Sequence, residues 1–461
     1  MNMNRRDALK ISAISIAAAT TMGLSACNSS EAKTSTVSAK GTKLKKYQVV
    51  IIGGGFGGLT VAKNIKKKNP SIEVLIIEKN DFFMACPFSN TYLGKLEGIN
   101  LGTFIRDYNE PTRNYGYDML KAVVTDINRK EKFVQTTQGS IKYDTLVLSP
   151  GIAYDYESTI PGISTDKIQE LRALAPGALI PGSEHVTLER NLSNMEDGNV
   201  IITVPSGKFR CPPAPFERAC MIAAYMKKED IRGKVIILNP SNKVAKGAAF
   251  KEAWKELYGD IIVHMEFAKI TDVDTKSKTI SISQTTKDEL DDKKVVKQTL
   301  SYQVLNLIPN NKANPVIEMS GVETSKDNFG KVIMNGCSFR TKSDASIYAV
   351  GDVVGHAIPP SGQTAIWSAK QCADEIVSGF AGKIYTLAVK SKTQKASNVC
   401  FSMVGDRPEE AIRVYHDFSW NGKVIKGKGR VPKGRNGKFR DTGTAQATRD
   451  WFRGSMNDLF A

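Results

Sequence analysis

A strand, a glycine-rich turn, a helix and a second strand follow one another in the first part of this chain. Residues 47–52 form a short apolar run rich in β-branched side chains, which is typical of a buried parallel strand. The turn 53–58 contains five glycines and leads into a helical pattern that Asn69 and Pro70 end. Residues 73–77 predict the next strand, and this order favours a fold with a parallel sheet.

Such a unit can bind the pyrophosphate of a dinucleotide. The spacing of Gly53, Gly55 and Gly58 permits a tight turn, close approach of the backbone to the pyrophosphate, and close packing of helix on strand. The helix N-terminus supplies unpaired N–H groups and the positive end of a dipole. Glu78 follows Gly58 by 20 residues and can accept hydrogen bonds from ribose hydroxyls. We therefore predict a dinucleotide site, in preference to a tight turn without a ligand.

Two later strands end in turns that complete the predicted cofactor site. Residues 145–149 form a strand that runs into a turn at Gly151, which can close the first segment of the cofactor domain. Another buried strand ends in Gly351 and Asp352, and an aspartate there can bond a ribityl hydroxyl of FAD. A helix predicted over residues 363–378 could stabilise negative charge on a reduced flavin with its N-terminus. The two segments together favour FAD as the cofactor.

The strand at residues 199–204 opens a second domain, where a pyridine-nucleotide fingerprint would be expected. Residues 205–213 replace it with three prolines, which remove N–H donors, and with Lys208 and Phe209, which crowd a phosphate turn. We therefore predict no NAD(P) site. The chain also contains neither a CxxC pair that would indicate zinc nor a CxxCH motif for attached haem, so we predict no metal site and no haem here.

Cys211 lies just ahead of a helix predicted over residues 215–228. The helix dipole would favour the thiolate and lower the pKa of Cys211. Glu217 lies in the first turn of that helix. It either complements the dipole or handles protons in a reaction, and the sequence leaves both interpretations open.

The N-terminus predicts export. Residues 4–10 resemble a twin-arginine motif, and the uncharged run 11–26 is too short for a convincing membrane span. That run leads into Cys27 through a motif similar to a bacterial lipobox, although an ordinary secretory signal with an incidental cysteine is the alternative. We predict a signal over residues 1–26, a flexible tether over residues 27–42, lipidation of Cys27, and a periplasmic protein held at a membrane surface by its lipid.

The formal net charge is +17, and much of it gathers near the C-terminus. One stretch without an acid holds eight cationic residues: Lys423, Lys426, Lys428, Arg430, Lys433, Arg435, Lys438 and Arg440. It is either a solvated surface loop or a docking site for an acidic partner or anionic lipid head groups. We expect no nucleic-acid binding, because an exported protein would not meet it and the chain contains no recognition module. No long amphipathic C-terminal helix is expected after this stretch.

Three cysteine-bearing segments complete the pattern: residues 86–90, residues 209–219, and residues 400–402. With them the chain resembles the flavoprotein subunit of flavocytochrome c sulfide dehydrogenase, from about Leu44 to Ala461. The patterns and this resemblance predict an α/β fold with two Rossmann-like domains of the disulfide-reductase type and a C-terminal α+β domain. The expected segments are FAD-binding residues 43–155, a second Rossmann-like domain 156–299, FAD-binding residues 300–382, and the C-terminal domain 383–461.

The resemblance also implies a chemistry. In that family the first cysteine carries FAD through a thioether, which implies covalent FAD at Cys86. The other two form a redox-active disulfide beside the flavin, which implies that Cys211 and Cys400 are bonded in the resting protein. Hydrosulfide would attack this disulfide, and the electrons would pass to FAD and then singly to the haem of a separate c-type cytochrome subunit in a heterodimer. The product would be sulfur or polysulfide.

Two other functions compete with this interpretation. A sulfide:quinone oxidoreductase shares the fold and the disulfide chemistry, but it needs an apolar, membrane-facing entrance. The sequence predicts no long C-terminal amphipathic helix, which counts against this function, and the predicted lipid anchor counts for it. The other is a non-catalytic flavoprotein that binds sulfur compounds or carries electrons, which the intact Cys211 and Cys400 disfavour. The disulfide itself could be a structural link between domains instead of a catalytic pair.

Overall fold

The structure is a computed structural model that describes residues 46–287, 292–326, 329–391 and 396–461. The predicted signal and tether, together with Cys27, lie outside the described residues.

The first sheet is built around β1 (Tyr47–Ile52), which pairs in parallel with β2 on one side and β8 on the other. The sheet order is β5-β2-β1-β8-β7-β6, with β20 also paired with β8. The other strands of this sheet are β2 (Val74–Glu78), β5 (Asp118–Lys121), β6 (Val124–Asn128), β7 (Phe133–Thr136), β8 (Gly139–Leu148) and β20 (Ile347–Ala349). All of β2 and most of β1 are buried, as expected for parallel strands covered on both faces.

Two long helices cover this sheet and pack against each other: α2 (Phe56–Lys68) and α11 (Gly362–Phe380). Asn69 and Pro70 end α2 as predicted, and three lysines in its last turn complement the helix dipole. Ser361 caps α11 by accepting a hydrogen bond from the N–H of Thr364. Smaller elements complete this part of the chain: β3 (Phe82–Met84), α3 (Asn90–Leu93), β4 (Ile105–Asp107), α4 (Asn109–Tyr115), α10 (Pro315–Met319), β18 (Thr324–Ser325) and β19 (Lys331–Val332).

The second sheet is a separate parallel sheet with the order β12-β11-β10-β16. Its strands are β10 (Val200–Thr203), β11 (Val235–Leu238), β12 (Ile262–Met265) and β16 (Val304–Asn306). Helix α8 (Ala214–Lys228) is buried along most of its length against this sheet, as its apolar sequence predicts. Because β16 pairs with β10, this sheet extends beyond residue 299, where the second domain was expected to end.

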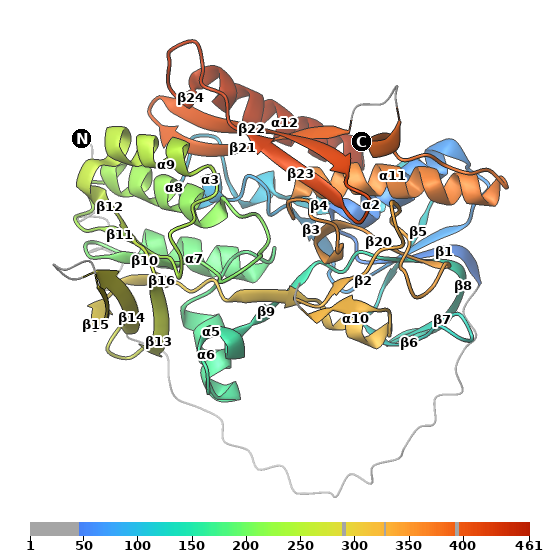
Figure 1. Ribbon diagram of the computed structural model, residues 1–461, viewed down its shortest axis with the longest axis horizontal. Coiled ribbons are helices and arrows are strands. Elements are labelled where there is room, and N and C mark those ends of the chain that lie inside the picture. Colours follow the sequence, from blue (N-terminus) through green and yellow to red (C-terminus); the bar gives the residue numbers. More distant parts are fainter. Residues whose placement is uncertain (1–45, 288–291, 327–328, 392–395) are drawn as a thin grey trace, which may run out of the picture. The chain divides into compact units, whose positions relative to one another are not determined.

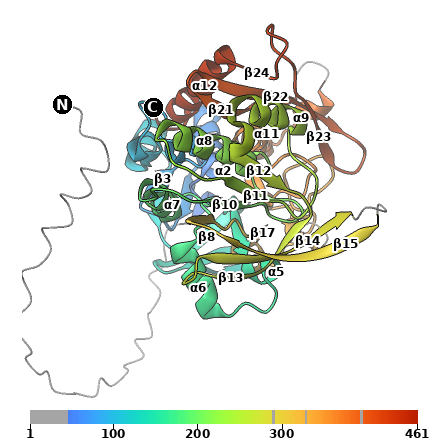
Figure 2. The same cartoon turned by 90° about the vertical axis from the view of Figure 1, so that its left-hand side faces the viewer.

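An antiparallel ribbon of three strands lies at one side of the second sheet and shares a small core with α5 and α6 (Figure 2). Its strands are β13 (Ala268–Asp274), β14 (Thr279–Lys287) and β15 (Lys293–Ser301). The other helical elements of this part of the chain are α5 (Tyr156–Thr159), α6 (Thr165–Leu174), α7 (Ser183–Ser193), α9 (Gly247–Ala253) and the π-helical turn η2 (Trp254–Tyr258). Of these, α9 and η2 pack with α8 in the core of the second sheet. Two strands form the antiparallel link between the sheets: β9 (Ile152–Asp155) and β17 (Asn310–Ala313).

The C-terminal part forms a third sheet with the order β21-β22-β23, and β24 pairs with β22. Its strands are β21 (Ser397–Asp406), β22 (Glu409–Trp420), β23 (Ile425–Arg430) and β24 (Arg440–Asp441). Figure 1 shows this part, in orange and red, lying over α8 and α11, and β21 contacts both helices. It thereby bridges the two Rossmann-like sheets.

The chain ends in a 19-residue helix, α12 (Thr442–Phe460), so the expectation of no long C-terminal helix is wrong. Several residues with low helix propensity, such as Thr442, Gly443 and Gly454, hide this helix in the sequence. Its apolar side is packed inward: Phe452 stacks on Phe88 with ring centroids 5.0 Å apart. Among the described residues, no helix combines the length and apolar character that a membrane crossing requires.

Candidate active site

The turn after β1 is shaped by its glycines. Gly53 has a φ of +106°, and a Cβ on it would lie 2.3 Å from the backbone oxygen of Ser149. A Cβ on Gly58 would lie 1.9 Å from the backbone oxygen of Gly53. Around a Cβ on Gly55, in contrast, the described residues place no atom within 4 Å. The backbone packing therefore requires Gly53 and Gly58, whereas Gly55 leaves open space at the start of α2.

Glu78, at the end of β2, holds this turn from the side. Its carboxylate is in an 8% exposed residue and accepts hydrogen bonds from the N–H groups of Gly54 (2.6 Å) and Asn80 (2.9 Å). Within the described part of the chain, no side chain caps the N-terminus of α2, so its first N–H groups remain for a ligand. The predicted phosphate turn and the acidic residue Glu78 are therefore in direct contact.

The two predicted cofactor segments meet beside this turn. β20 and β8 are parallel neighbours, and the N–H of Val350 donates to the oxygen of Leu148 at 3.0 Å. Gly151 and Gly351, which follow these strands, have φ values of +73° and +76°, a region that glycine adopts without strain. Residues about 200 apart in the sequence therefore lie together at the same edge of the sheet.

Arg210 connects the predicted cofactor residues, although the sequence did not single it out. Its Nε lies 3.3 Å from Oδ2 of Asp352, and its Nη1 donates to the backbone oxygen of Leu179 at 3.3 Å. The Sγ of Cys86 donates to the same oxygen at 3.3 Å. Burial works against the charge of Arg210, but the neighbouring Cys86 and Asp352 raise its pKa overall. Its only sequence signal is its place directly before Cys211.

The N-terminus of α11 contacts the Cys86 loop. A Cβ on Gly362 would lie 2.7 Å from Cγ of Pro87, so the helix start and the loop are in close contact. The next residue, Gln363, buries its side-chain nitrogen with no hydrogen-bond partner among the described residues. A buried amide donor without a partner is unfavourable unless a ligand accepts its hydrogen bond. This position therefore suits a ligand that carries acceptor oxygen or nitrogen atoms.

Cys211 lies between β10 and α8 in a left-handed backbone conformation with a φ of +50°. Its N–H donates to the oxygen of Pro360 at 2.7 Å, which links this turn to the loop before α11. The prediction that the helix dipole lowers the pKa of Cys211 is wrong. Burial raises that pKa, and the carboxylate of Glu217 adds to the effect, because desolvation and a like charge both disfavour the thiolate.

Cys400 lies on β21, and its Sγ is 3.8 Å from the hydroxyl of Ser361. The charge of Cys400 is among those that raise the pKa of Cys211, which places the two thiols in one site. Both are free thiols in the structure, so the disulfide expected in the resting protein is not formed here. Each cysteine instead keeps local contacts, and two free thiols correspond to the reduced form of such a pair. The bonded form stays a prediction.

Glu217 lies close enough to Cys211 to affect its pKa and is only 7% exposed. Its Oε1 accepts a hydrogen bond from the N–H of Met403 on β21 at 3.1 Å. Burial raises the pKa of Glu217 to about 7, although Lys246 and the hydrogen bonds act in the opposite direction. A carboxyl group with such a pKa can both take up and release protons near neutral pH, which supports the proton-handling interpretation.

Lys246 is the member of this site that the sequence did not reveal. It directly precedes α9, and its Nζ donates to the hydroxyl of Ser402 at 2.8 Å. Burial raises the pKa values of Cys400, Glu217 and Cys211, and the positive charge of Lys246 acts in the opposite direction on all three. The sequence around it is a small-residue loop with no recognisable motif, so only the fold could place it beside the cysteines.

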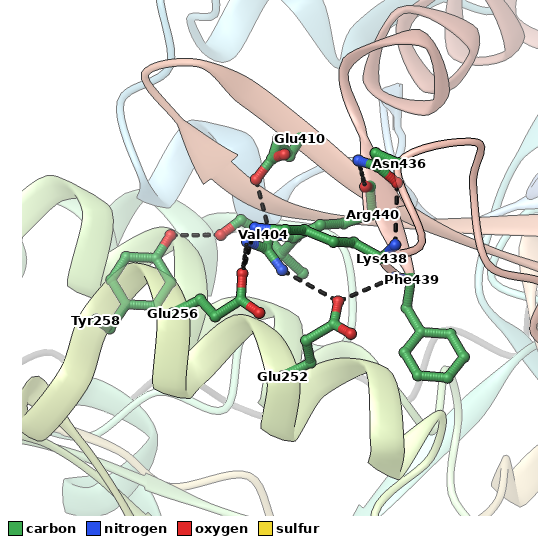
Figure 3. A network of polar contacts seen from close by, with 9 residues as sticks. All are labelled: Glu252, Glu256, Tyr258, Val404, Glu410, Asn436, Lys438, Phe439 and Arg440. Carbon is green, nitrogen blue, oxygen red and sulfur yellow. Dashed lines mark hydrogen bonds and ion pairs between the residues drawn. The ribbon is translucent and has the colours of Figure 1, made fainter.

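A buried network of charges holds the C-terminal sheet against the segment that follows Lys246 (Figure 3). Arg440 of β24 has a side chain that is 3% exposed, and it forms ion pairs with three carboxylates: Glu252 (3.1 Å), Glu256 (2.7 Å) and Glu410 (2.7 Å). Lys438 also pairs with Glu256 (2.6 Å). The hydroxyl of Tyr258 donates to the backbone oxygen of Val404 on β21. The network thus joins α9 and η2 to the strand that carries Cys400.

This network also divides the basic stretch of residues 423–440. Lys438 and Arg440 are held by carboxylates, whereas Lys426, Lys428 and Arg430 lie exposed on β23. The solvated-loop interpretation therefore does not describe the whole stretch, because its first part is a strand paired with β22. Among the described residues, no group of three or more His, Cys, Asp and Glu side chains is arranged to hold a metal ion.

Two family models match parts of the chain. The model described as "Sulfide dehydrogenase [flavocytochrome c] flavoprotein chain, central" matches residues 185–309, which include Cys211, Glu217 and Lys246. The model described as "Pyridine nucleotide-disulphide oxidoreductase" matches residues 47–178, which include the glycine turn and Cys86.

Similar proteins point in the same direction. The mitochondrial sulfide:quinone oxidoreductase of Mus musculus is 24% identical over 363 residues, covering 76% of this chain and 73% of that protein. The sulfide dehydrogenase [flavocytochrome c] flavoprotein chain of Chlorobaculum thiosulfatiphilum is 51% identical over 43 residues, covering 9% of this chain and 90% of that sequence. The solved sulfide:quinone oxidoreductase of Aquifex aeolicus has a TM-score of 0.66 at 17% identity, covering 89% of this chain and 91% of that one. The predicted α/β fold of the disulfide-oxidoreductase type is confirmed.

Proposed function

Since the chain belongs to the family of flavocytochrome c sulfide dehydrogenase flavoprotein chains, within the sulfide:quinone oxidoreductase-like flavoproteins, we propose that it oxidises sulfide through Cys211 and Cys400 with a flavin as electron carrier. The observation that carries the proposal is the site itself. Three cysteines from distant segments, a carboxyl group with a pKa of about 7 and an ammonium group lie together, and Arg210 connects them to Asp352.

The residues present fit a flavin dinucleotide. Open space at Gly55, the uncapped start of α2 and the unpaired amide of Gln363 are what a bound dinucleotide would use. Gly53 and Gly58 would support the pyrophosphate turn, and Glu78, Gly151, Gly351 and Asp352 would line the rest of the site. A bound flavin would supply two-electron chemistry toward sulfur and single-electron release toward an acceptor.

We also propose that the flavin is attached to Cys86 by a thioether. The thiol of Cys86 lies beside Arg210, close to the N-terminus of α11 through Pro87, and so on the side of the site where a flavin ring would lie. A thioether survives denaturation, so a denatured gel band of the protein should fluoresce. The Cys86→Ala protein should carry only flavin that acid precipitation releases, and release of all flavin from the unmodified protein would contradict the attachment.

The chain's own residues can carry the sulfur steps. When Cys211 and Cys400 are bonded, hydrosulfide attacks one sulfur, a new S–S bond forms, the old one breaks, and its electron pair stays on the other cysteine as a thiolate. Glu217 lies within the site and can accept the proton that the incoming sulfur loses. Arg210 and Pro360 hold Cys211 in position, and the Arg440 network holds Cys400 through β21.

For the electron acceptor we propose the haem of a separate c-type cytochrome. The exposed cations of β23 support an acidic partner. The backbone of Ala357 accepts one hydrogen bond from β23 at 3.0 Å and donates another to it at 2.9 Å, so this strand lies against Ala357. Only two residues lie between Ala357 and Pro360, which contacts Cys211. A partner on β23 would therefore sit near the sulfur site, and charge would steer it there.

A quinone is the second candidate acceptor, because relatives named sulfide:quinone oxidoreductase resemble most of the chain. Quinone reduction requires an apolar entrance facing a membrane. The apolar side of α12 packs into the core, which leaves it unsuited to that task.

A further proposal is that the protein is a periplasmic lipoprotein, exported by the twin-arginine route and anchored at Cys27. Cys27→Ser should move it from the membrane fraction to the soluble fraction.

One anaerobic experiment tests the function. Purified protein with its flavin is mixed with sulfide, and the flavin absorbance is followed before and after adding either oxidised cytochrome c or a short-chain quinone. We expect sulfide to bleach the flavin and cytochrome c to restore it. Restoration by the quinone alone would favour the second candidate, and no bleaching by sulfide would overturn the proposed function.

A further inference from the structure

We propose that Lys246 is a positioning residue of the sulfur site, whose ammonium group holds Cys400, and not Cys211, as the thiolate when the pair is reduced. This inference rests on the proposed function, because it concerns the same cysteine pair. It goes further in assigning the negative charge of the reduced pair to one sulfur and in giving a role to a lysine that no motif contains.

The geometry of β21 supports this assignment. Side chains two positions apart on a strand point to the same face, so Cys400 and Ser402 share one face of β21. The register with β22 is regular here, with Cys400 opposite Val414 and Ser402 opposite Ile412. The Nζ of Lys246 donates to the hydroxyl of Ser402 at 2.8 Å, and Ser402 is fully buried. The ammonium group is therefore anchored on the face of the strand that carries the Cys400 sulfur.

Lys246 lacks a carboxylate partner. Among the described residues, no carboxylate oxygen lies within ion-pair distance of its Nζ, and the hydrogen bond to Ser402 joins it to a neutral hydroxyl. Burial lowers the pKa of Lys246, because water solvates the buried ammonium group only in part. A desolvated cation whose hydrogen-bond partner is neutral, and whose neighbouring carboxyl group Glu217 is charged only in part near pH 7, is unfavourable until an anion comes close. A thiolate on Cys400 would be such an anion.

Other charged groups around this site do not replace Cys400 in this role. Glu217 lies on α8, its pKa is raised to about 7, and its carboxylate already accepts the N–H of Met403. Cys211 also lies near, but burial and Glu217 raise its pKa, and together they outweigh the opposing effect of Lys246. His416 of β22 has its pKa lowered to about 4 by burial, so it is neutral near pH 7 and adds no positive charge there. Burial raises the pKa of Cys400 as well, and Lys246 is the largest influence that acts against this effect and favours the thiolate.

The Arg440 network keeps this arrangement rigid (Figure 3). Lys246 directly precedes α9, which carries Glu252, and Glu256 and Tyr258 follow in η2. Arg440 binds both carboxylates, and Tyr258 bonds to Val404, four residues after Cys400 on β21. The distance between Lys246 and Cys400 is thus set by contacts outside the sulfur site, which is the arrangement that a preorganised charge requires.

The test measures the ionisation of Cys400 directly and needs no sulfide. In the reduced full-length Cys211→Ser protein, the rate of alkylation of Cys400 by iodoacetamide is followed against pH by peptide mass spectrometry. Only the thiolate reacts, so the midpoint of this profile reports the pKa of the Cys400 thiol. We expect Lys246→Met to move the midpoint upward by about one pH unit or more, and Lys246→Arg to keep it near the unmodified value.

Two further variants keep the test decisive. Lys251→Met, on the same helix but paired with Glu266, is the matched control and should leave the midpoint unchanged. Ser402→Ala removes the anchor of the ammonium group and should raise the midpoint by less than Lys246→Met does, which provides the test if the Lys246→Met protein does not fold. An unchanged midpoint in both Lys246→Met and Ser402→Ala would overturn the inference. Failure of sulfide to bleach the flavin would overturn the proposed function and leave this profile interpretable by itself.

Discussion

The turn after β1 and the turn after β10 start from the same local design and reach opposite outcomes. Each follows a buried parallel strand and leads into a helix. In the first turn, glycines bring backbone segments together and leave the start of α2 uncapped and open around Gly55, as far as the described residues show. In the second, three N–H groups are already taken: Ser206 donates to Asn310 (2.6 Å), Arg210 to Asn311 (2.9 Å), and Cys211 to Pro360 (2.7 Å).

This difference shows that a helix N-terminus becomes a phosphate site only where its donors and the space around them are left for the ligand. The second turn also lacks that space, since a Cβ on Gly207 would lie 2.3 Å from the ring of Phe329. These contacts support the prediction that this turn does not bind a second dinucleotide. The same contacts hold Cys211 in a strained left-handed conformation, directly ahead of α8. One fold unit has become a cofactor turn and the other a thiol turn.

The largest expected effect is in the first turn. Gly58→Val should destabilise the protein by about 3 kcal/mol or more and abolish flavin binding, because its side chain would collide with the backbone of Gly53. Gly55→Ala is the matched control, since its Cβ meets open space. It should change the free energy of unfolding of the flavin-free protein by less than about 0.5 kcal/mol, yet lower flavin occupancy. Thermal unfolding and the flavin-to-protein absorbance ratio measure both; a Gly55→Ala protein that keeps the flavin occupancy of the unmodified protein would contradict a phosphate role for this turn.

The thiol turn should respond in the opposite way. Cys211→Ser or Cys400→Ser should keep the flavin and the fold but slow sulfide-driven bleaching by more than about 10³-fold. The reason is that the one cysteine of the pair that remains in each variant cannot form the reactive disulfide. Titration of thiols before and after reduction should show one fewer disulfide than in the unmodified protein. Cys337→Ser, at a partly exposed cysteine outside the site, is the control. A Cys400→Ser protein that sulfide reduces at the unmodified rate would make the pair structural.

A smaller effect is expected at Glu217, next to the thiol turn. The rate of sulfide-driven bleaching should change with an inflection near pH 7, and Glu217→Gln should remove that inflection. The stability has a definite sign as well. Because the folded-state pKa is raised from 4.5 to about 7, the folded protein holds the proton longer, so stability falls as pH rises through this window. Denaturant unfolding of Glu217→Gln should lack this fall; an identical pH dependence would rule out the raised pKa.

The smallest expected effect is none at all. NADH added anaerobically should leave the flavin oxidised, because three N–H groups of the second turn are bonded within the protein and the ring of Phe329 lies against Gly207. Sulfide added to the same cuvette provides the positive control. Rapid bleaching by NADH would show that the second turn still binds a pyridine nucleotide. The two turns would then differ in sequence but not in their ability to bind a dinucleotide.

The sequence by itself determined the strand–turn–helix units, the positions of most strands and helices around the cofactor turn, and the fold class. These features depend on local patterns: apolar runs, glycine spacing and prolines act over a few residues. Cys86, Cys211, Cys400 and Glu217 could be proposed for one site because their segments carry recognisable motifs. The C-terminal helix α12 escaped prediction because its propensity is weak and its packing against Phe88 stabilises it.

Only the tertiary structure decided the electrostatics of the site. Arg210 joins Cys86 to Asp352, and Lys246 lies beside Cys400, although these residues are between 124 and 154 positions apart in each of these pairs. The pKa of Cys211 moved opposite to the sequence-based prediction, because burial and a neighbouring carboxylate outweigh a helix dipole. Desolvation and charge–charge interactions depend on distances in space, and a sequence contains those distances only through the fold.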